Sequence, residues 1–174
     1  MDKNMTLEKR IDAELYSYQG RMSVFVDDLQ GHTVERGADE EFETASVIKA
    51  FLLAQMARGT LVSKAASVEM LAILRQQHYN TMLTKDFPQY YLDCEETGAP
   101  ELLWVASKSG SMNACRNDGG IVHTPYGEYV IVLMNKDFHD IIEYNDHPAI
   151  VYGARVSRII LDQVLACEGK LWLD

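Results

Sequence analysis

Apolar positions in the first third of the chain recur at helix and strand spacing. Four apolar residues between positions 7 and 18 share one helical face, which Thr6 can cap and Gly20 can end. Residues 22–28 and 33–36 are rich in Val, Phe and Thr and predict two short strands joined by a tight turn. We therefore expect a helix followed by a β-hairpin.

The next segment predicts a helix of unusual character. Ten of the 13 residues from Ala45 to Ala57 are apolar, and the exceptions are Ser46, Lys49 and Gln55. A helix that is apolar on all sides is normally buried on all sides. A third helix follows, with Ser63 as its expected cap.

The second half of the chain predicts mainly strands. Its expected elements are a loop over 87–100, strands over 102–106, 119–123 and 128–134, a turn at 124–127, and a final helix that Pro148 opens. Short connections between strands favour antiparallel pairing. We predict an α+β fold in one domain over residues 1–174. In it, an antiparallel sheet of about five strands packs with N- and C-terminal helices and the buried 45–57 helix.

Composition narrows the function classes. The chain has 174 residues, 47% of them apolar, and a net charge of −10. Such a negative charge argues against nucleic-acid partners and against binding to anionic membrane surfaces. The start of the chain shows no basic segment followed by an apolar one, and no apolar run approaches the ~18 residues of a membrane span. We expect a cytoplasmic protein whose three widely spaced cysteines form neither a disulfide framework nor a zinc site.

Ser46 and Lys49 form the first candidate for chemistry. Residues three apart share a helical face, so the lysine amine lies within one turn of the serine hydroxyl. A serine needs an adjacent base to become a nucleophile, and a lysine serves if burial or a second cation keeps it partly neutral. The spacing alone is common by chance, but a charged residue on an otherwise apolar helix is costly without a role.

Lys108, Ser109 and Gly110 form the second candidate, at the end of the 102–106 strand and followed by Ser111. A strand edge there would offer a cation, a hydroxyl and backbone N–H groups to an acyl substrate and its carboxylate. Taken alone, the tripeptide is a weak signal, and a solvated strand end is the better interpretation.

Together and in this order, S-x-x-K and K-[ST]-G resemble two of the three motifs of class A β-lactamases and penicillin-binding proteins. Further segments of the chain resemble the family's first hairpin, its nucleophile segment, the helix before its third strand and the strand after K-T-G. These segments are Met22–Leu29, Phe42–Lys49, Glu69–Asn80 and Asn117–Val122.

The resemblance implies a serine hydrolase that needs no metal or organic cofactor. Its substrate would be a small molecule: a β-lactam, or a related amide or ester with a nearby carboxylate. The implied roles are Ser46 as acylated nucleophile, Lys49 as base or proton relay, Lys108 as a catalytic cation, Ser109, Gly110 and Arg116 in substrate binding, and the backbone N–H groups of Ser46 and Ser111 as the oxyanion hole.

The sequence also departs from the family. It has no S-D-N and no Ω-loop glutamate to place the deacylating water, and only residues 59–62 stand where a helical region would be inserted. We therefore expect slow deacylation, and homo-oligomer formation through a stripe that includes Phe51, Leu53 and Met56. The alternative is a shrunken, non-catalytic relative that binds or self-assembles.

One further group could hold a metal ion. His139, Glu143 and His147 have the i, i+4, i+8 spacing of one helical face. Pro148 and the Asn145-Asp146 turn argue against a straight helix there. We interpret these residues as a polar surface loop and expect no metal site.

Overall fold

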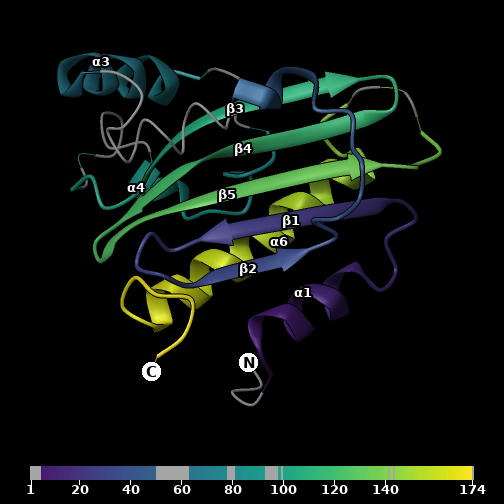
Figure 1. The fold of residues 1–174 in the computed structure, drawn as a ribbon, viewed down its shortest axis with the longest axis horizontal. Helices are drawn as coiled ribbons and strands as arrows, with labels where there is room; N and C mark the ends of the chain where they lie inside the picture. Colours follow the sequence, from purple (N-terminus) through teal and green to yellow (C-terminus); the bar gives the residue numbers. More distant parts are fainter. Residues whose placement is uncertain are drawn as a thin grey trace.

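The structure of the protein is a computed structural model. It describes residues 5–49, 63–77, 81–92, 98, 100–140, 142 and 144–173, except for the side chains of residues 48 and 49. Five strands form one antiparallel sheet in the order β2-β1-β5-β4-β3, shown in Figure 1. The strands are β1 (Arg21–Asp27), β2 (Thr33–Arg36), β3 (Trp104–Met112), β4 (Cys115–Thr124) and β5 (Gly127–Lys136). The predicted α+β class and antiparallel sheet are confirmed.

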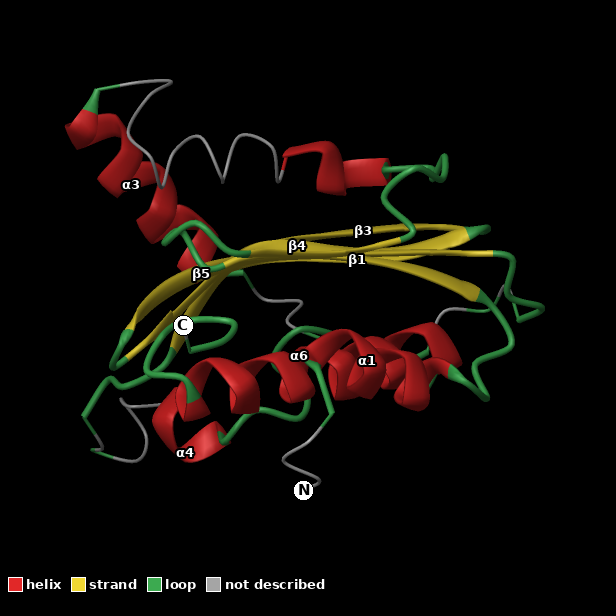
Figure 2. Ribbon diagram, turned by 60° about the horizontal axis from the view of Figure 1, so that its bottom comes forward, coloured by secondary structure: helices red, strands yellow, loops and turns green. Residues whose placement is uncertain are grey.

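Helices lie on both faces of this sheet. The terminal helices α1 (Leu7–Leu15) and α6 (Pro148–Ala166) lie side by side on one face, with the short α4 (Gln89–Leu92) on the same side (Figure 2). The 3-10 helix η1 (Ala45–Lys49) and α3 (Lys64–Arg75) lie on the other face. The two terminal helices therefore cover one face together, as the sequence predicts.

The helix starts follow from capping side chains. Thr6 Oγ1 accepts the N–H of Lys9 at 3.4 Å, and Ser63 Oγ accepts that of Ala66 at 3.3 Å. Both are N-caps that satisfy a backbone donor which the helix itself leaves free. The first helix is shorter than predicted and ends at Leu15.

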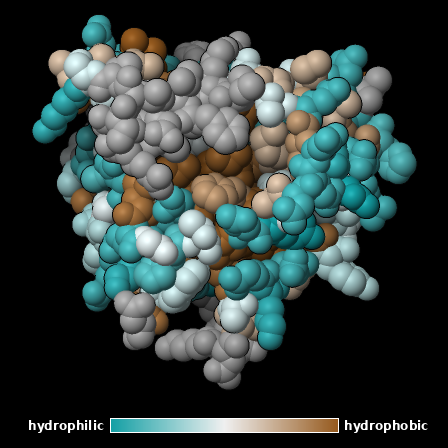
Figure 3. All heavy atoms as spheres, in the orientation of Figure 1, coloured by the Kyte–Doolittle hydropathy of each residue, from teal (hydrophilic) through white to brown (hydrophobic). Residues whose placement is uncertain are grey.

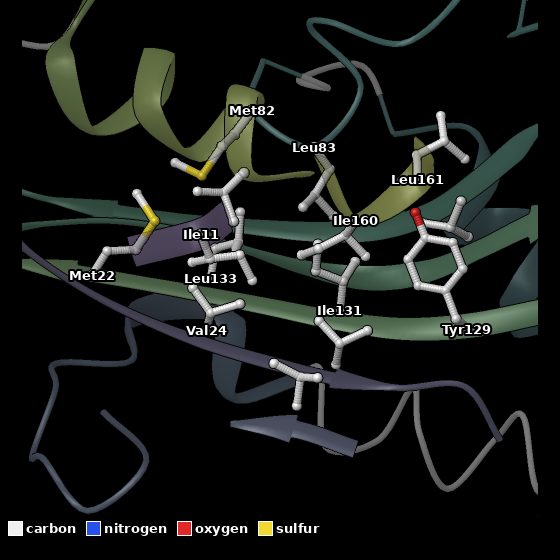
Figure 4. Packing of buried hydrophobic residues seen from close by; sticks show 14 of the residues in the cluster. Ile11, Met22, Val24, Met82, Leu83, Tyr129, Ile131, Leu133, Ile160 and Leu161 are labelled. Carbon is white, nitrogen blue, oxygen red and sulfur yellow. The ribbon is translucent and has the colours of Figure 1, made fainter. Parts of the chain in front are cut away.

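The main core fills the space between the sheet and the terminal helices, as Figure 4 shows. Alternate residues of β1 and β5 point into it, because successive side chains of a strand face opposite ways. Its fully buried members include Ile11, Val24, Ile131, Leu133, Ile160 and Leu161.

Several boundaries differ from the prediction. All three C-terminal strands are longer than expected, and β3 continues through the Lys108–Gly110 tripeptide instead of ending before it. The predicted 45–57 helix is described only to Lys49, as a 3-10 helix. The rest of it, the 59–62 connection and the Phe51, Leu53 and Met56 stripe lie outside the described residues. No helix in the described part of the chain is long and apolar enough to cross a membrane.

Candidate active site

Ser46 lies on η1, close to Gly110 near the C-terminal end of β3. The residue before it, Ala45, has a φ of 46°, in the left-handed region that non-glycine residues rarely adopt. Gly110 of β3 faces this turn, and a Cβ on it would lie 2.8 Å from Ser46 N and 2.9 Å from Val47 N. The glycine of the K-S-G motif is therefore required for the close approach of the serine turn to the sheet.

A cavity of about 510 Å³ opens beside this turn. Its lining includes six residues that the sequence predicted for the site, and these are Ser46, Lys108, Ser109, Gly110, Ser111 and Arg116. The remaining lining residues are Thr81, Met82, Asn117, Asp118, Tyr144, Asn145 and Ile150. Segments from four distant parts of the sequence thus meet around one space.

The structure describes the side chain of only one of the two predicted lysines. Lys108 is half-buried, and its Nζ donates to the carbonyl oxygen of Ser109 at 2.6 Å. β3 lies at the end of the described sheet, with β4 as its neighbour on one side. Lys49 ends η1, one 3-10 turn after Ser46 along the backbone. Its side chain lies outside the described residues.

Arg116 is buried in the cavity wall. Its Nη1 donates to the carbonyl oxygens of Met112 and, at 2.9 Å, of Cys115. Its guanidinium carbon lies 5.6 Å from the centre of the Phe138 ring. The side chain therefore supports the turn between β3 and β4, next to the position where the sequence expects a substrate carboxylate.

Asp118 is a buried carboxyl group that sequence reasoning did not single out. It is 1% exposed, and it accepts the N–H of Leu83 at 3.3 Å and that of Gly119 at 3.0 Å. Burial raises its pKa to about 7, although both N–H bonds and the charge of Lys108 oppose the rise. The predicted strand starts only at Gly119, so the apolar pattern gave no local signal for this residue.

The segment before α6 forms another side of the cavity. His147 is fully buried: its Nδ1 accepts the N–H of Ala149 at 3.1 Å, and its Nε2 donates to the Asp140 carbonyl at 2.7 Å. The interpretation of His147 as part of a polar surface loop was therefore wrong, because the ring caps α6 inside the protein. Tyr144 donates to the Asp140 carboxylate at 2.6 Å, which lowers the pKa of that carboxyl. Glu143 lies outside the described residues.

The comparisons with known proteins agree with this architecture. Solved structures with similar folds include a β-lactamase from Sphaerobacter thermophilus DSM 20745, with a TM-score of 0.73 and 13% identity over 92% of this chain and 97% of that one. A β-lactamase from Chitinophaga pinensis DSM 2588 has a TM-score of 0.68 and 13% identity, over 91% of this chain and 99% of that one. The structure of PBP-A has a TM-score of 0.51 and 22% identity, over 80% of this chain and 43% of that one. At such identities the likeness is one of fold.

Sequence comparison gives the family itself. No curated protein sequence matches the chain. The sequence model Beta-lactamase2, which describes the Beta-lactamase enzyme family, matches residues 6–58 and 50–164. The two matched segments contain both motifs and nearly all of the described sheet. This chain therefore belongs to the Beta-lactamase enzyme family.

Proposed function

We propose that this protein is a serine hydrolase that is acylated at Ser46 by β-lactams, or by related amides and esters that carry a nearby carboxylate. The observation that supports the proposal best is the 510 Å³ cavity, which is lined by both Ser46 and Lys108–Ser111. Membership of the family gives this arrangement its chemical interpretation.

The proposed reaction begins with the Ser46 hydroxyl. Its oxygen attacks the substrate carbonyl carbon while a neutral Lys49 takes the proton. The backbone N–H groups of Ser46 and Ser111 stabilise the negative charge on the carbonyl oxygen. The C–N bond of the substrate then breaks, the leaving nitrogen receives a proton, and an ester remains on Ser46.

Lys108, Ser109 and Arg116 are proposed to bind the substrate carboxylate. Lys108 supplies a charge in a half-buried setting, where water screens it less than at the surface. Arg116 adds a second positive charge in the cavity wall.

Hydrolysis of the ester is proposed to be slow. The sequence has neither S-D-N nor an Ω-loop glutamate, so the groups that the family uses to activate the deacylating water are absent from it. A mutant of PBP-A, whose structure is similar to 80% of this chain, has been captured as an acyl-enzyme complex with penicillin G. Penicillin G is therefore a suitable probe.

The test is the intact mass of the protein after incubation with penicillin G. We expect one stable adduct that persists after free penicillin is removed. Ser46→Ala should abolish the adduct, while Ser17→Ala, at a serine outside the cavity lining, should retain it. An adduct that survives in Ser46→Ala would place the nucleophile elsewhere.

A wild-type protein that gives neither adduct nor hydrolysed penicillin would contradict the proposal. Such a result would favour the non-catalytic alternative, a protein that binds or self-assembles. Light scattering on the same sample would test the predicted homo-oligomer.

A further inference from the structure

A buried side chain of β4 holds the chain just ahead of Ser46. Asn117 Nδ2 donates to the carbonyl oxygen of Glu43 at 2.7 Å and to that of Thr44 at 3.4 Å. The Thr44 carbonyl also accepts the N–H of Val47 at 3.1 Å. One amide group therefore fixes the carbonyls from which the serine turn starts.

The orientation of this amide is fixed from within the sheet. Asn117 Oδ1 accepts the backbone N–H of Asn135 at 2.8 Å, so Nδ2 must be the atom that faces the carbonyls. Asn135 in turn donates to the Arg116 carbonyl at 2.7 Å and accepts the Tyr18 hydroxyl at 3.0 Å. Asn117 is 2% exposed and Asn135 0%, so water does not compete for these bonds.

Asn117 also lies directly opposite Gly110 in the register of β3 and β4. This one cross-strand pair acts on the serine turn in two ways: Gly110 leaves space for it, and Asn117 bonds to it. Ala45 is held between these contacts at a φ of 46°, a conformation that is strained for a residue other than glycine and persists only where surrounding contacts enforce it.

We propose that Asn117 is a positioning residue for Ser46, which it orients for attack by anchoring residues 43 and 44 to β4. The inference rests on the proposed function of Ser46 as the nucleophile. A displacement of about 1 Å at a reacting atom can lower a rate about 100-fold. Loss of the anchor should therefore slow the chemical step more than it weakens binding.

The first variant is Asn117→Asp, which keeps the shape of the side chain and its acceptor for Asn135. It replaces the donor by an oxygen that repels the two carbonyls. We expect the first-order acylation rate constant with penicillin G to fall about 10–100-fold, and the dissociation constant of the preceding non-covalent complex to change less than about threefold.

Thr124→Val is the matched control. Thr124 lies on the same strand, about 23 Å from Asn117. The change removes the 2.9 Å bond that its hydroxyl donates to the Gly127 carbonyl and the 3.2 Å bond that it accepts from the Tyr126 N–H. We expect it to lower the melting temperature without changing the acylation rate constant. If Asn117→Asp and Thr124→Val slow acylation equally at equal loss of melting temperature, the positioning role is wrong.

Gly110→Ala disturbs the same turn from the other side and serves if Asn117→Asp does not fold. Amide hydrogen exchange at Val47 provides a readout that does not need activity: both Asn117→Asp and Gly110→Ala should accelerate it, and Thr124→Val should not. Wild-type protein without any adduct, together with faster exchange in these variants, would support the anchor and overturn the proposed function. Unchanged exchange and unchanged acylation would overturn the inference itself.

Discussion

The two faces of the sheet differ in how they are covered. One face packs against α1 and α6, and its contacts join most of the buried apolar side chains into one cluster. The other face carries a small cluster around Val47, Ile121 and Val130, with half-buried neighbours such as Val132 and Met134. Figure 3 views this second face and shows a hydrophobic hollow at its centre.

The closely packed face contributes mainly to stability, and the cavity and pocket described here are formed with residues of the other face. An apolar pocket of about 370 Å³ lies on the face that carries η1, lined by Phe25, Val132 and Met134 among others. Ser46 and Gly110 meet on this same face, at the end of the sheet. The closely packed face supplies rigid support for β3 and β4, whose residues line the 510 Å³ cavity.

The largest effect should come from deleting a side chain on the packed face. Leu133 is fully buried in the main core, and its neighbour Met134 is half-buried on the other face. Leu133→Ala should lower the free energy of unfolding by about 2–5 kcal/mol, because it leaves a cavity in a tightly packed region. Met134→Ala should cost about 1 kcal/mol, since this side chain is only half-buried and lines the 370 Å³ pocket. Urea denaturation of both variants measures the contrast, and equal losses would remove the distinction between the faces.

A second effect, whose size depends on pH, should come from Asp118, a carboxyl group that is 1% exposed. Its native pKa of about 7 exceeds the ordinary value of 3.8, so the unfolded chain releases this proton first as the pH rises. This group therefore lowers stability by about 1.4 kcal/mol per pH unit between these two values.

Asp118→Asn should remove that dependence. The stability of the variant relative to wild type should rise from pH 4 to pH 7 and level off above it, measured by urea denaturation at several pH values. Asp146→Asn, whose side chain is 85% exposed, is the control and should give a much flatter difference. A difference for Asp118→Asn that does not change with pH would show that this carboxyl titrates normally.

The smallest effect should come from Arg75, which connects α3 to the sheet. Its guanidinium lies 4.8 Å above the Trp104 ring and pairs with Glu101. Both charged side chains are substantially exposed, so water and salt weaken their attraction. Arg75→Ala should cost less than about 1 kcal/mol of unfolding free energy. A larger loss in urea denaturation would mean that α3 stabilises the protein far more than these contacts indicate.

The sequence predicts most of the packed face and part of the site. Helix starts at Thr6 and Ser63 follow from local capping chemistry, which needs no tertiary context. In α3, however, Val68 and Ile73 are 61% and 64% exposed although both side chains are strongly apolar. Local periodicity indicates which residues could be buried, but the partner surface decides which of them are.

Polar residues inside strands were the part of the site that was harder to predict from the sequence. Asn117 and Asp118 are unfavourable in strands by intrinsic preference, so the pattern places the start of that strand at Gly119. In the structure, β4 begins at Cys115, and both polar side chains are buried and hydrogen-bonded to backbone groups 35 to 74 residues away. No local window of sequence contains those partners.

The bond between Asn117 and Glu43 also has a consequence for protein synthesis. Its two ends are 74 residues apart, and Asn117 is the later one. At translation rates of 5–20 residues per second, the serine turn is made roughly 4–15 s before the residue that anchors it. On the ribosome, the nascent chain therefore carries Ser46 for seconds before its anchor exists, and the geometry around this serine forms only after β4 has been made.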